Sequence, residues 1–570
     1  MGLFKFIFKI IGVLLTIIGL CTVLLVGCAY LLSGGSYEPY STEFTLNDED
    51  IQNFKDAAAK FEESIIKEKS EFSISLSSSE FVDAYFKIET QYKIAYLHYC
   101  EDTTDKVALE NYNYAFKAYN DASNLYNETL KNILVSGSSA ADLIFEGWSE
   151  EDKNFILNDK EDAYILSEEN EALLLEYRDL SRNDEGWAEA VDEIYIELVK
   201  NYNAIAEVYD YTDYYSFASE MGYSRDYTAE QRETLREYVK EYIVPLYIEN
   251  SARLDTLYAE ADDETKAKFD MLMTASFVQN EEIKGYVKSY INSFSGGENG
   301  YNAGDYMNDF FLEDRAIFAD NENAHDIAYT TFLSYYGEAM SYFGPSYQNA
   351  FTVVHEMGHF AAFLINGTQN MALDVCEVHS QSNEWLFLAY LDGILEEDVY
   401  ELYLLARLTD GFKRIILSTA VDECEERIYT SESLASPEDC AAIIDEVMAL
   451  YGEEIREKLM LDDYFRYVAP DSPVYYLSYA VSEIASIENY TVAAKNLVLA
   501  QSNYSDFVYS AFDTEVTNGV LKVAFDKATY EKFVEMFSYG EAVEDAEDTE
   551  LGGESGTVYV LLPEWYLPAA

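Results

Sequence analysis

The residues with the clearest chemical potential are His355, Glu356 and His359, within the sequence His-Glu-Met-Gly-His. The surrounding residues 350–365 are mostly apolar and contain no proline, which predicts a helix. Histidines four residues apart lie one above the other on a helix, so both imidazoles can bind one Zn²⁺ ion. Glu356 would project roughly 100° away from His355 and could take a proton from water acidified by the metal. A chance match is disfavoured because the whole chain has only five histidines.

A zinc site of this kind requires a third protein ligand, and its position separates the classes of metallopeptidase. A histidine at position 365 with glycine at 362 would mark a metzincin, but the chain has Ile365 and Ala362, which excludes that class. The candidates lie a little further along the chain: Asp374, Glu377, His379 and Glu384. Glu377 and Glu384 are seven residues apart and would share a helical face, whereas His379 would point away from Glu377.

The segment from Glu377 to Glu384 (EVHSQSNE) resembles the second zinc motif of the thimet oligopeptidase/oligoendopeptidase F family. The resemblance implies that Glu377 is the third zinc ligand and that Glu384 orients a ligand imidazole, while His379 has no metal role. Residues 197–247 look like the helical opening of that family's catalytic domain, and residues 472–486 (SPVYYLSYAVSEIAS) look like its tyrosine motif. The similarity extends over about 190–490.

The tyrosine motif implies catalytic residues beyond the zinc site. In the family, tyrosines of this motif donate hydrogen bonds to the oxyanion of the tetrahedral intermediate, and Tyr476 and Tyr479 are the best matches, with Tyr475 as a further possibility. A phenol suits this role because it is neutral at pH 7 and offers a single donor. The chain departs from the family at Ala362, where a histidine is common, and it has no histidine after His379.

The pattern of the remaining chain is mainly helical. Apolar and aromatic residues recur at steps of three and four through to about residue 294, and again from about 348 to 482, with a Gly/Ser/Asn-rich loop at 293–305. Residues 328–345 are expected to form a few short strands. The resemblance implies a mainly α, two-lobed helical zincin of the gluzincin type, with a deep substrate channel and at most a small β-sheet near the active site.

The N-terminus predicts a membrane segment. Two lysines precede an apolar run of about 23 residues, enough for a spanning helix with an extracytoplasmic catalytic part, although Leu25–Cys28 also resembles a lipoprotein lipidation site. The predicted organisation is 1–34 as membrane anchor or lipoprotein signal, 35–190 as an N-terminal helical region, 191–540 as the catalytic domain and 541–570 as an acidic tail.

The composition excludes some classes of protein. The formal net charge of −69 disfavours nucleic-acid binding. The few cysteines exclude a disulfide scaffold, although Cys424 and Cys440 could pair.

The combined interpretation is a zinc-dependent metalloendopeptidase that binds one Zn²⁺ per chain and hydrolyses short peptides outside the membrane. Glu356 would be the general base, and His355, His359 and Glu377 the metal ligands. The absent family histidine motivates an alternative, a catalytically weak or inactive relative that acts as a surface peptide-binding protein. A zincin from another class with a glutamate ligand is a third possibility, in which the later tyrosines would lie far from the metal.

Overall fold

The computed structural model describes residues 40–539, apart from short gaps at 146–152, 154–155, 158–160, 179, 183–185, 313, 369–370, 432–433 and 435. The predicted membrane segment at 1–34 and the acidic tail at 541–570 lie outside the described residues. Within the described part, no helix combines the length and the apolar character needed to cross a membrane. The described residues divide into two compact units, the first formed by those within 40–99, 103–158 and 333–338 and the second by the other described residues.

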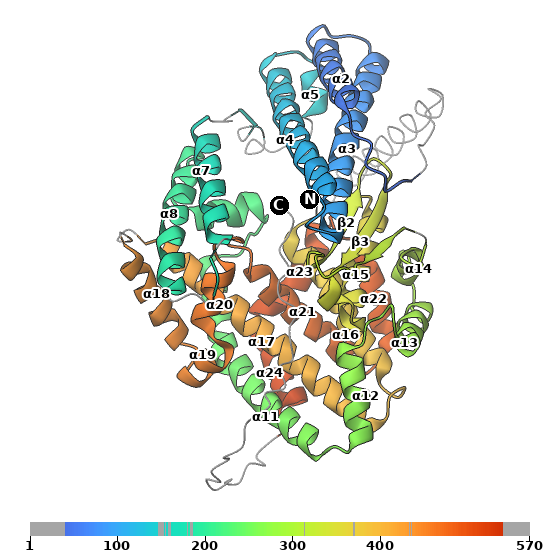
Figure 1. Cartoon of the computed structure of the whole chain (residues 1–570), viewed down its shortest axis with the longest axis vertical. Helices are drawn as coiled ribbons and strands as arrows, with labels where there is room; N and C mark the ends of the chain where they lie inside the picture. The colour runs from blue at the N-terminus through green and yellow to red at the C-terminus, as the bar shows by residue number, and fades with distance from the viewer. Residues whose placement is uncertain are drawn as a thin grey trace, which may run out of the picture. The chain divides into compact units, whose positions relative to one another are not determined.

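The first unit is mainly helical, and Figure 1 shows its helices in blue to cyan. Its helices are α2 (Asp48–Ile66), α3 (Glu71–Glu101), of which residues 100–101 belong to the second unit, α4 (Lys106–Val135) and α5 (Ala141–Ile144). Asn47 caps α2 by accepting hydrogen bonds from two backbone N–H groups, which a helix otherwise leaves without partners at its start. Stacked aromatic rings form much of the core, with Phe81 4.8 Å from Tyr126 and 5.4 Å from Phe54 between centroids.

The second unit contains most of the helices and the whole of the predicted site. The helices are α7 (Glu161–Arg178), α8 (Trp187–Val208), α9 (Tyr214–Phe217), α10 (Ala229–Tyr238), α11 (Val244–Glu260), α12 (Asp263–Thr274), α13 (Glu281–Asn292), α14 (Ala303–Asp309), α15 (Ala350–Asn366), α16 (Leu373–Leu391), α17 (Glu397–Tyr429), α18 (Pro437–Ala449), α19 (Glu453–Leu459), α20 (Leu461–Val468), α21 (Leu477–Ala493), α22 (Leu497–Tyr509), α23 (Thr514–Leu521) and α24 (Lys527–Phe537). Helix α7 packs against α8, so this unit begins earlier in the chain than the catalytic domain predicted at 191. The predicted domain bounds stay a prediction.

One small sheet accompanies these helices. It consists of β1 (Ala316–Phe318), β2 (Ala328–Leu333) and β3 (Glu338–Phe343), with β3 between the other two. Strands β1 and β3 are parallel, with Ala316 opposite Ser341 and Phe318 opposite Phe343. The prediction of a mainly α fold with a small sheet is therefore confirmed, and β2 and β3 fall within the segment expected to form strands.

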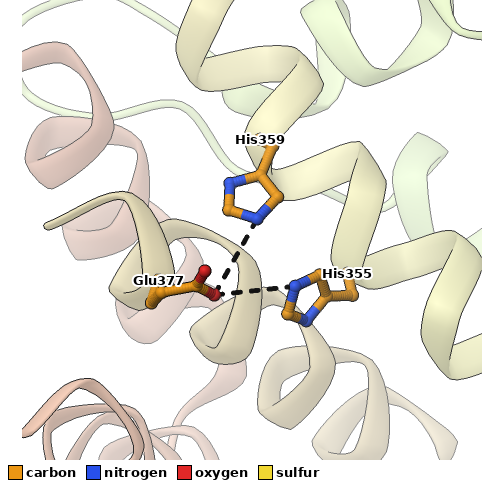
Figure 2. A group of neighbouring side chains, drawn as sticks. All are labelled: His355, His359 and Glu377. Carbon is orange, nitrogen blue, oxygen red and sulfur yellow. Dashed lines mark ion pairs between the residues drawn. The ribbon is translucent and has the colours of Figure 1, made fainter. Parts of the chain in front are cut away.

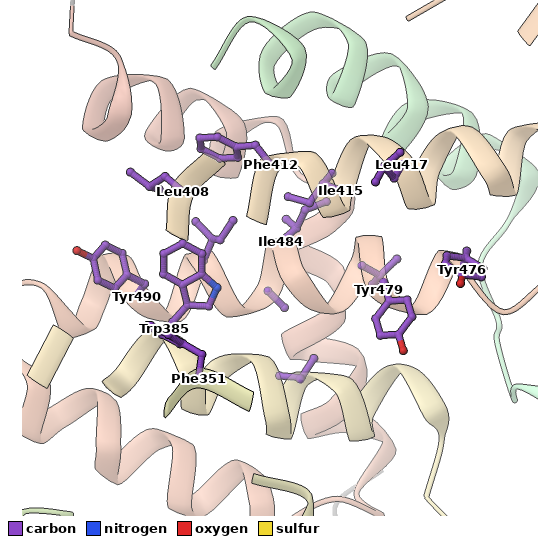
Figure 3. Packing of buried hydrophobic residues seen from close by; sticks show 14 of the residues in the cluster. Phe351, Trp385, Leu408, Phe412, Ile415, Leu417, Tyr476, Tyr479, Ile484 and Tyr490 are labelled. Atoms are coloured by element: carbon purple, nitrogen blue, oxygen red, sulfur yellow. The ribbon is translucent and has the colours of Figure 1, made fainter. Parts of the chain in front are cut away.

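The core of the second unit lies where α15, α16, α17 and α21 pack together. Figure 3 shows Trp385 of α16 between residues of α17 and α21, including Phe412 and Ile484. All three side chains are at most 2% exposed. Cys424 and Cys440 are buried free cysteines, so the disulfide considered between them is not formed. This packing fixes the relative placement of the helices that carry the predicted site residues.

Candidate metal centre

Helix α15 presents the two histidines of the motif. Asn349 caps its first turn by accepting hydrogen bonds from the N–H groups of Phe351 and Thr352, and Gly367, with φ of 68°, ends it in the left-handed conformation that glycine adopts readily. His355 and His359 lie on the same face of this helix, as their spacing predicts. Both are buried, at 5% and 8% exposure, so the pair faces the interior of the unit.

Glu377 of α16 completes a group of three potential ligands. Its Oε2 lies 3.7 Å from Nε2 of His355 and 3.9 Å from Nε2 of His359 (Figure 2). One ligand atom from each of the three side chains lies within 4.8 Å of the others. Donors about 2.0–2.2 Å from a tetrahedral zinc ion are roughly 3.4 Å apart, so a small inward movement would bring these atoms to zinc-binding distance.

The chemistry of the three side chains also fits a zinc ion. Two imidazoles and one carboxylate are a known ligand set of catalytic zinc sites. Burial, together with the neighbouring His355 and His379, holds the pKa of His359 well below its ordinary value, which keeps the ring in the neutral form that a metal ligand requires. Burial raises the pKa of Glu377, although His355 opposes the shift, and a bound cation would supply the charge that favours its ionised form.

Glu384 lies directly behind His355. Its Oε1 is 2.6 Å from Nδ1 of His355, which leaves Nε2 of that ring on the side of Glu377. Burial would raise the pKa of Glu384, but Arg414 and Arg407 of α17, together with His355, lower it to about 2. The carboxylate therefore stays ionised and holds one tautomer of the imidazole, an arrangement that commonly orients histidine ligands.

Glu356 is held by the small sheet. The Thr330 hydroxyl, on β2, donates to Oε2 of Glu356 over 2.6 Å, and the same hydroxyl is 2.8 Å from the Ser341 hydroxyl on β3. Glu356 is fully buried. The predicted placement of the sheet near the site is therefore confirmed, and its contribution is to orient the carboxylate next to the two histidines.

Of the three tyrosines considered, Tyr475 contacts the ligand group. Its hydroxyl lies 3.3 Å from Oε1 of Glu377 and 3.1 Å from the hydroxyl of Tyr479. Tyr476 packs its ring against Tyr464, with centroids 5.9 Å apart. Burial raises the pKa of Tyr475, Tyr476 and Tyr479 well above the ordinary value, so all three remain neutral donors. In Figure 3 the Tyr479 hydroxyl points away from Leu417 and α17.

The other candidates for the third ligand are engaged elsewhere. Asp374 pairs with Arg225, with Oδ1 3.2 Å from Nε. His379 is fully buried with its ring against Phe507 at 5.0 Å, and burial lowers its pKa to about 3. Glu384 sits behind His355 as described. The structure therefore brings Glu377 to the histidine pair, and its role as the third ligand stays a prediction.

Several residues of the site escaped the sequence prediction. Thr330 belongs to no recognisable sequence motif, and only the fold brings it, on β2, next to Glu356 on α15. Arg407 and Arg414 are seven residues apart and thus share a face of α17, which was the one available signal for them.

Gly358 allows α15 and α16 to approach closely enough to form the ligand group. A Cβ at this position would lie 2.5 Å from the carbonyl oxygen of His379 and 2.8 Å from Cα of Ser380. We expect Gly358→Ala to lower the free energy of unfolding by about 1–3 kcal/mol, because backbone atoms would have to move. Urea denaturation measures this change.

The control for that prediction is Gly285→Ala in α13, where a Cβ meets no atom within 4 Å. Alanine there should raise the free energy of unfolding by about 0.5–1 kcal/mol through its higher helix propensity. Equal effects of the two substitutions would contradict the role assigned to Gly358.

Known proteins resemble this chain in part of its sequence and in its fold. No family model matches the sequence. Oligopeptidase PepF of Bacillus subtilis is 27% identical over 188 residues, which cover 31% of this chain and 28% of that protein, so the match spans less than a third of the relative. A Bacillus anthracis structure assigned as an oligoendopeptidase F superposes with a TM-score of 0.64 at 16% identity, covering 88% of this chain and 97% of the other.

A second similar structure is PZ peptidase A with an inhibitor, which gives a TM-score of 0.61 at 14% identity and covers 88% of this chain and 98% of the other. At such low identities these likenesses establish the fold. The chain therefore has the fold of the oligoendopeptidase F structures, which is the fold that the resemblance of the Glu377–Glu384 segment predicted.

Proposed function

We propose that this protein is a zinc-dependent metallopeptidase that hydrolyses short peptides. The observation that carries the proposal is the group of His355, His359 and Glu377, whose ligand atoms lie within 4.8 Å of one another. The peptidase names of the relatives with this fold support the same class. The preference for short peptides rests on the resemblance, and the deep channel it implies stays a prediction.

His355, His359 and Glu377 would hold the ion, which when bound supplies a Lewis acid for the scissile carbonyl and increases the acidity of water. Glu356 then accepts a proton from the attacking water and passes it to the leaving amine. The Thr330 hydroxyl donates to Oε2 of Glu356 and would hold the carboxylate of the base in one orientation. Thus Thr330 fixes the orientation of the base during both proton transfers.

The tyrosines would act on the oxyanion that forms from the scissile carbonyl. Tyr479 is proposed as a donor to this oxyanion, and Tyr475, which lies between Tyr479 and Glu377, as the residue that places it. Tyr476, which faces Tyr464, is proposed to support the segment by packing. The sequence predicted Tyr476 as a donor to the oxyanion alongside Tyr479; in this proposal Tyr475 supports Tyr479 instead, and Tyr476 is not a donor.

Metal analysis tests the proposal. The purified protein should contain about one equivalent of zinc, since the site has three protein ligands. Removal of the metal with a chelator should abolish cleavage of a fluorogenic peptide, and added zinc should restore it. A metal-free protein that cleaves the peptide at the same rate would refute the proposal. Peptide binding with zinc bound but without turnover would instead favour the surface peptide-binding alternative.

A further inference from the structure

Val474, the residue immediately before the tyrosines, has an unusual backbone conformation. Its φ is 60° and its side chain is fully buried. A β-branched residue is rarely found in the left-handed region, because its side chain crowds the backbone there. Such a conformation persists only where the surroundings hold it, and such strain is found disproportionately at functional sites.

Two side chains hold Val474 through both of its backbone polar groups. Its N–H donates to Oε1 of Glu425 over 2.8 Å, and its carbonyl oxygen accepts from Nη1 of Arg225 over 2.6 Å. Glu425 is fully buried on α17. Since both backbone groups of Val474 are engaged by fixed ionisable side chains, rotation of this residue to an ordinary φ would break both hydrogen bonds.

Arg225 also binds the residues that follow. Its Nη2 donates to the carbonyl oxygen of Tyr475 over 3.1 Å and to the hydroxyl of Ser478 over 2.6 Å. Nη1 and Nη2 of one guanidinium therefore span the backbone from Val474 to the first turn of α21. A planar group with five donors can do this, whereas the ammonium of lysine presents a compact point charge.

Asp374 connects this guanidinium to the helix that carries Glu377. Its two carboxylate oxygens lie 3.2 and 3.3 Å from Nε of Arg225, and the two side chains are 3% and 2% exposed. Asp374 also accepts from Ser478 over 2.5 Å. Asp374 and Glu377 are three residues apart on α16, so one face of this helix carries both the anchor of Arg225 and the third ligand candidate.

We propose that Arg225 is a positioning residue: paired with Asp374, it holds Val474 in the left-handed conformation and so places the hydroxyl of Tyr475 beside Glu377 and that of Tyr479 beside Tyr475. The inference rests on the proposed function, in which Tyr479 donates to the oxyanion. Arg225 does not touch the reacting atoms. It acts through the backbone of the tyrosine segment, here defined as residues 473–479.

The test uses Arg225→Lys in the full-length zinc-loaded protein. Arg225 lines a pocket of about 200 Å³, and lysine is smaller and keeps the positive charge beside Asp374. We expect kcat for a fluorogenic peptide to fall about tenfold or more, because donors displaced by a fraction of an ångström stabilise the oxyanion less well. KM and the zinc dissociation constant should stay within about twofold, since Arg225 is not a member of the ligand group and is proposed to act only through the tyrosine segment.

Arg236→Lys is the matched control. Arg236 has a buried side chain, 5% exposed, and its ion-pair partners include Asp422 and Glu426 of α17. Its substitution removes a buried guanidinium of the same kind without touching the tyrosine segment, so kcat should stay within about twofold of the wild type. An equal loss of kcat in Arg225→Lys and Arg236→Lys would mean that loss of any buried guanidinium destabilises the protein and lowers kcat. That result would overturn the proposal.

A double-mutant cycle with Tyr479→Phe separates positioning from a structural role. If Arg225 acts through Tyr479, the loss of kcat in the double variant should be close to that of Tyr479→Phe alone, because the group being positioned is already absent. If instead the fold-loss of kcat in the double variant equals the product of the losses in the two single variants, Arg225 acts by another route and the proposal is overturned.

Amide hydrogen exchange distinguishes failure of this inference from failure of the proposed function. Arg225→Lys should accelerate exchange in the tyrosine segment, whereas Arg236→Lys should leave it unchanged. This measurement requires no catalytic activity. If the wild type hydrolysed no peptide, the proposed function would fail while the exchange data would still decide the role of Arg225; unchanged exchange in Arg225→Lys would overturn the inference even in an active enzyme.

Discussion

Replacing Glu356 with glutamine is expected to lower kcat for peptide hydrolysis by roughly 10²–10⁴-fold, the usual contribution of a general base. Glutamine keeps the shape of the side chain, and its amide can still contact Thr330, but it cannot accept a proton from water at neutral pH. Because Glu356 is not among the three ligand candidates, zinc content should stay at about one equivalent. Steady-state kinetics and metal analysis of the same preparation measure both quantities.

Thr330→Val is the graded control for this prediction. Valine retains most of the volume and removes the hydroxyl that donates to Oε2 of Glu356 over 2.6 Å. Losing one hydrogen bond to a charged group should lower kcat by about tenfold, less than losing the carboxylate itself. Wild-type turnover by Glu356→Gln would exclude Glu356 as the base, whatever the behaviour of the threonine variant.

Replacing Glu377 with glutamine is expected to lower zinc affinity by more than about a hundredfold. The carboxylate is the one anionic member of the ligand group, and its loss removes both a donor atom and the charge that offsets the cation. Competition with a chromogenic chelator measures the dissociation constant. Peptidase activity should fall with zinc occupancy and recover in part at high zinc concentration.

Glu384→Gln provides the comparison that identifies the ligand. Glu384 contacts His355 through Nδ1, on the side of the ring away from Glu377, so it should affect zinc only through the orientation of the imidazole. Substitution of such an outer carboxylate typically lowers metal affinity by about 10–100-fold. If Glu384→Gln lowers zinc affinity more than Glu377→Gln does, then Glu384 is the ligand and Glu377 is the outer carboxylate.

The large-scale fold could be predicted because its signals are local and repeated. Apolar residues at helical spacing run through most of the chain, and the helices form where this spacing indicates them. The bounds of the compact units were harder to place. Helix α7 has a pattern like those of the helices before it, and only its packing against α8 assigns it to the second unit.

The sequence by itself determined the pair of histidines and the glutamate between them, since spacing along one helix specifies which side chains share a face. It left open four candidates for the third ligand, and the resemblance singled out Glu377. What brings Glu377 to the histidines is the crossing of α15 and α16 at Gly358, a contact between distant segments that no local pattern encodes.

Only the tertiary structure decided which tyrosine faces the ligand group. Sequence register favoured Tyr476 and Tyr479, whereas the structure places the Tyr475 hydroxyl beside Glu377, with the Tyr479 hydroxyl next to that of Tyr475. The physical reason is the left-handed conformation of Val474, which a β-branched residue adopts only because Arg225 and Glu425 bind both sides of it. Those two residues lie about 250 and 50 positions away in the chain, so this turn depends on the assembled fold and not on its own sequence.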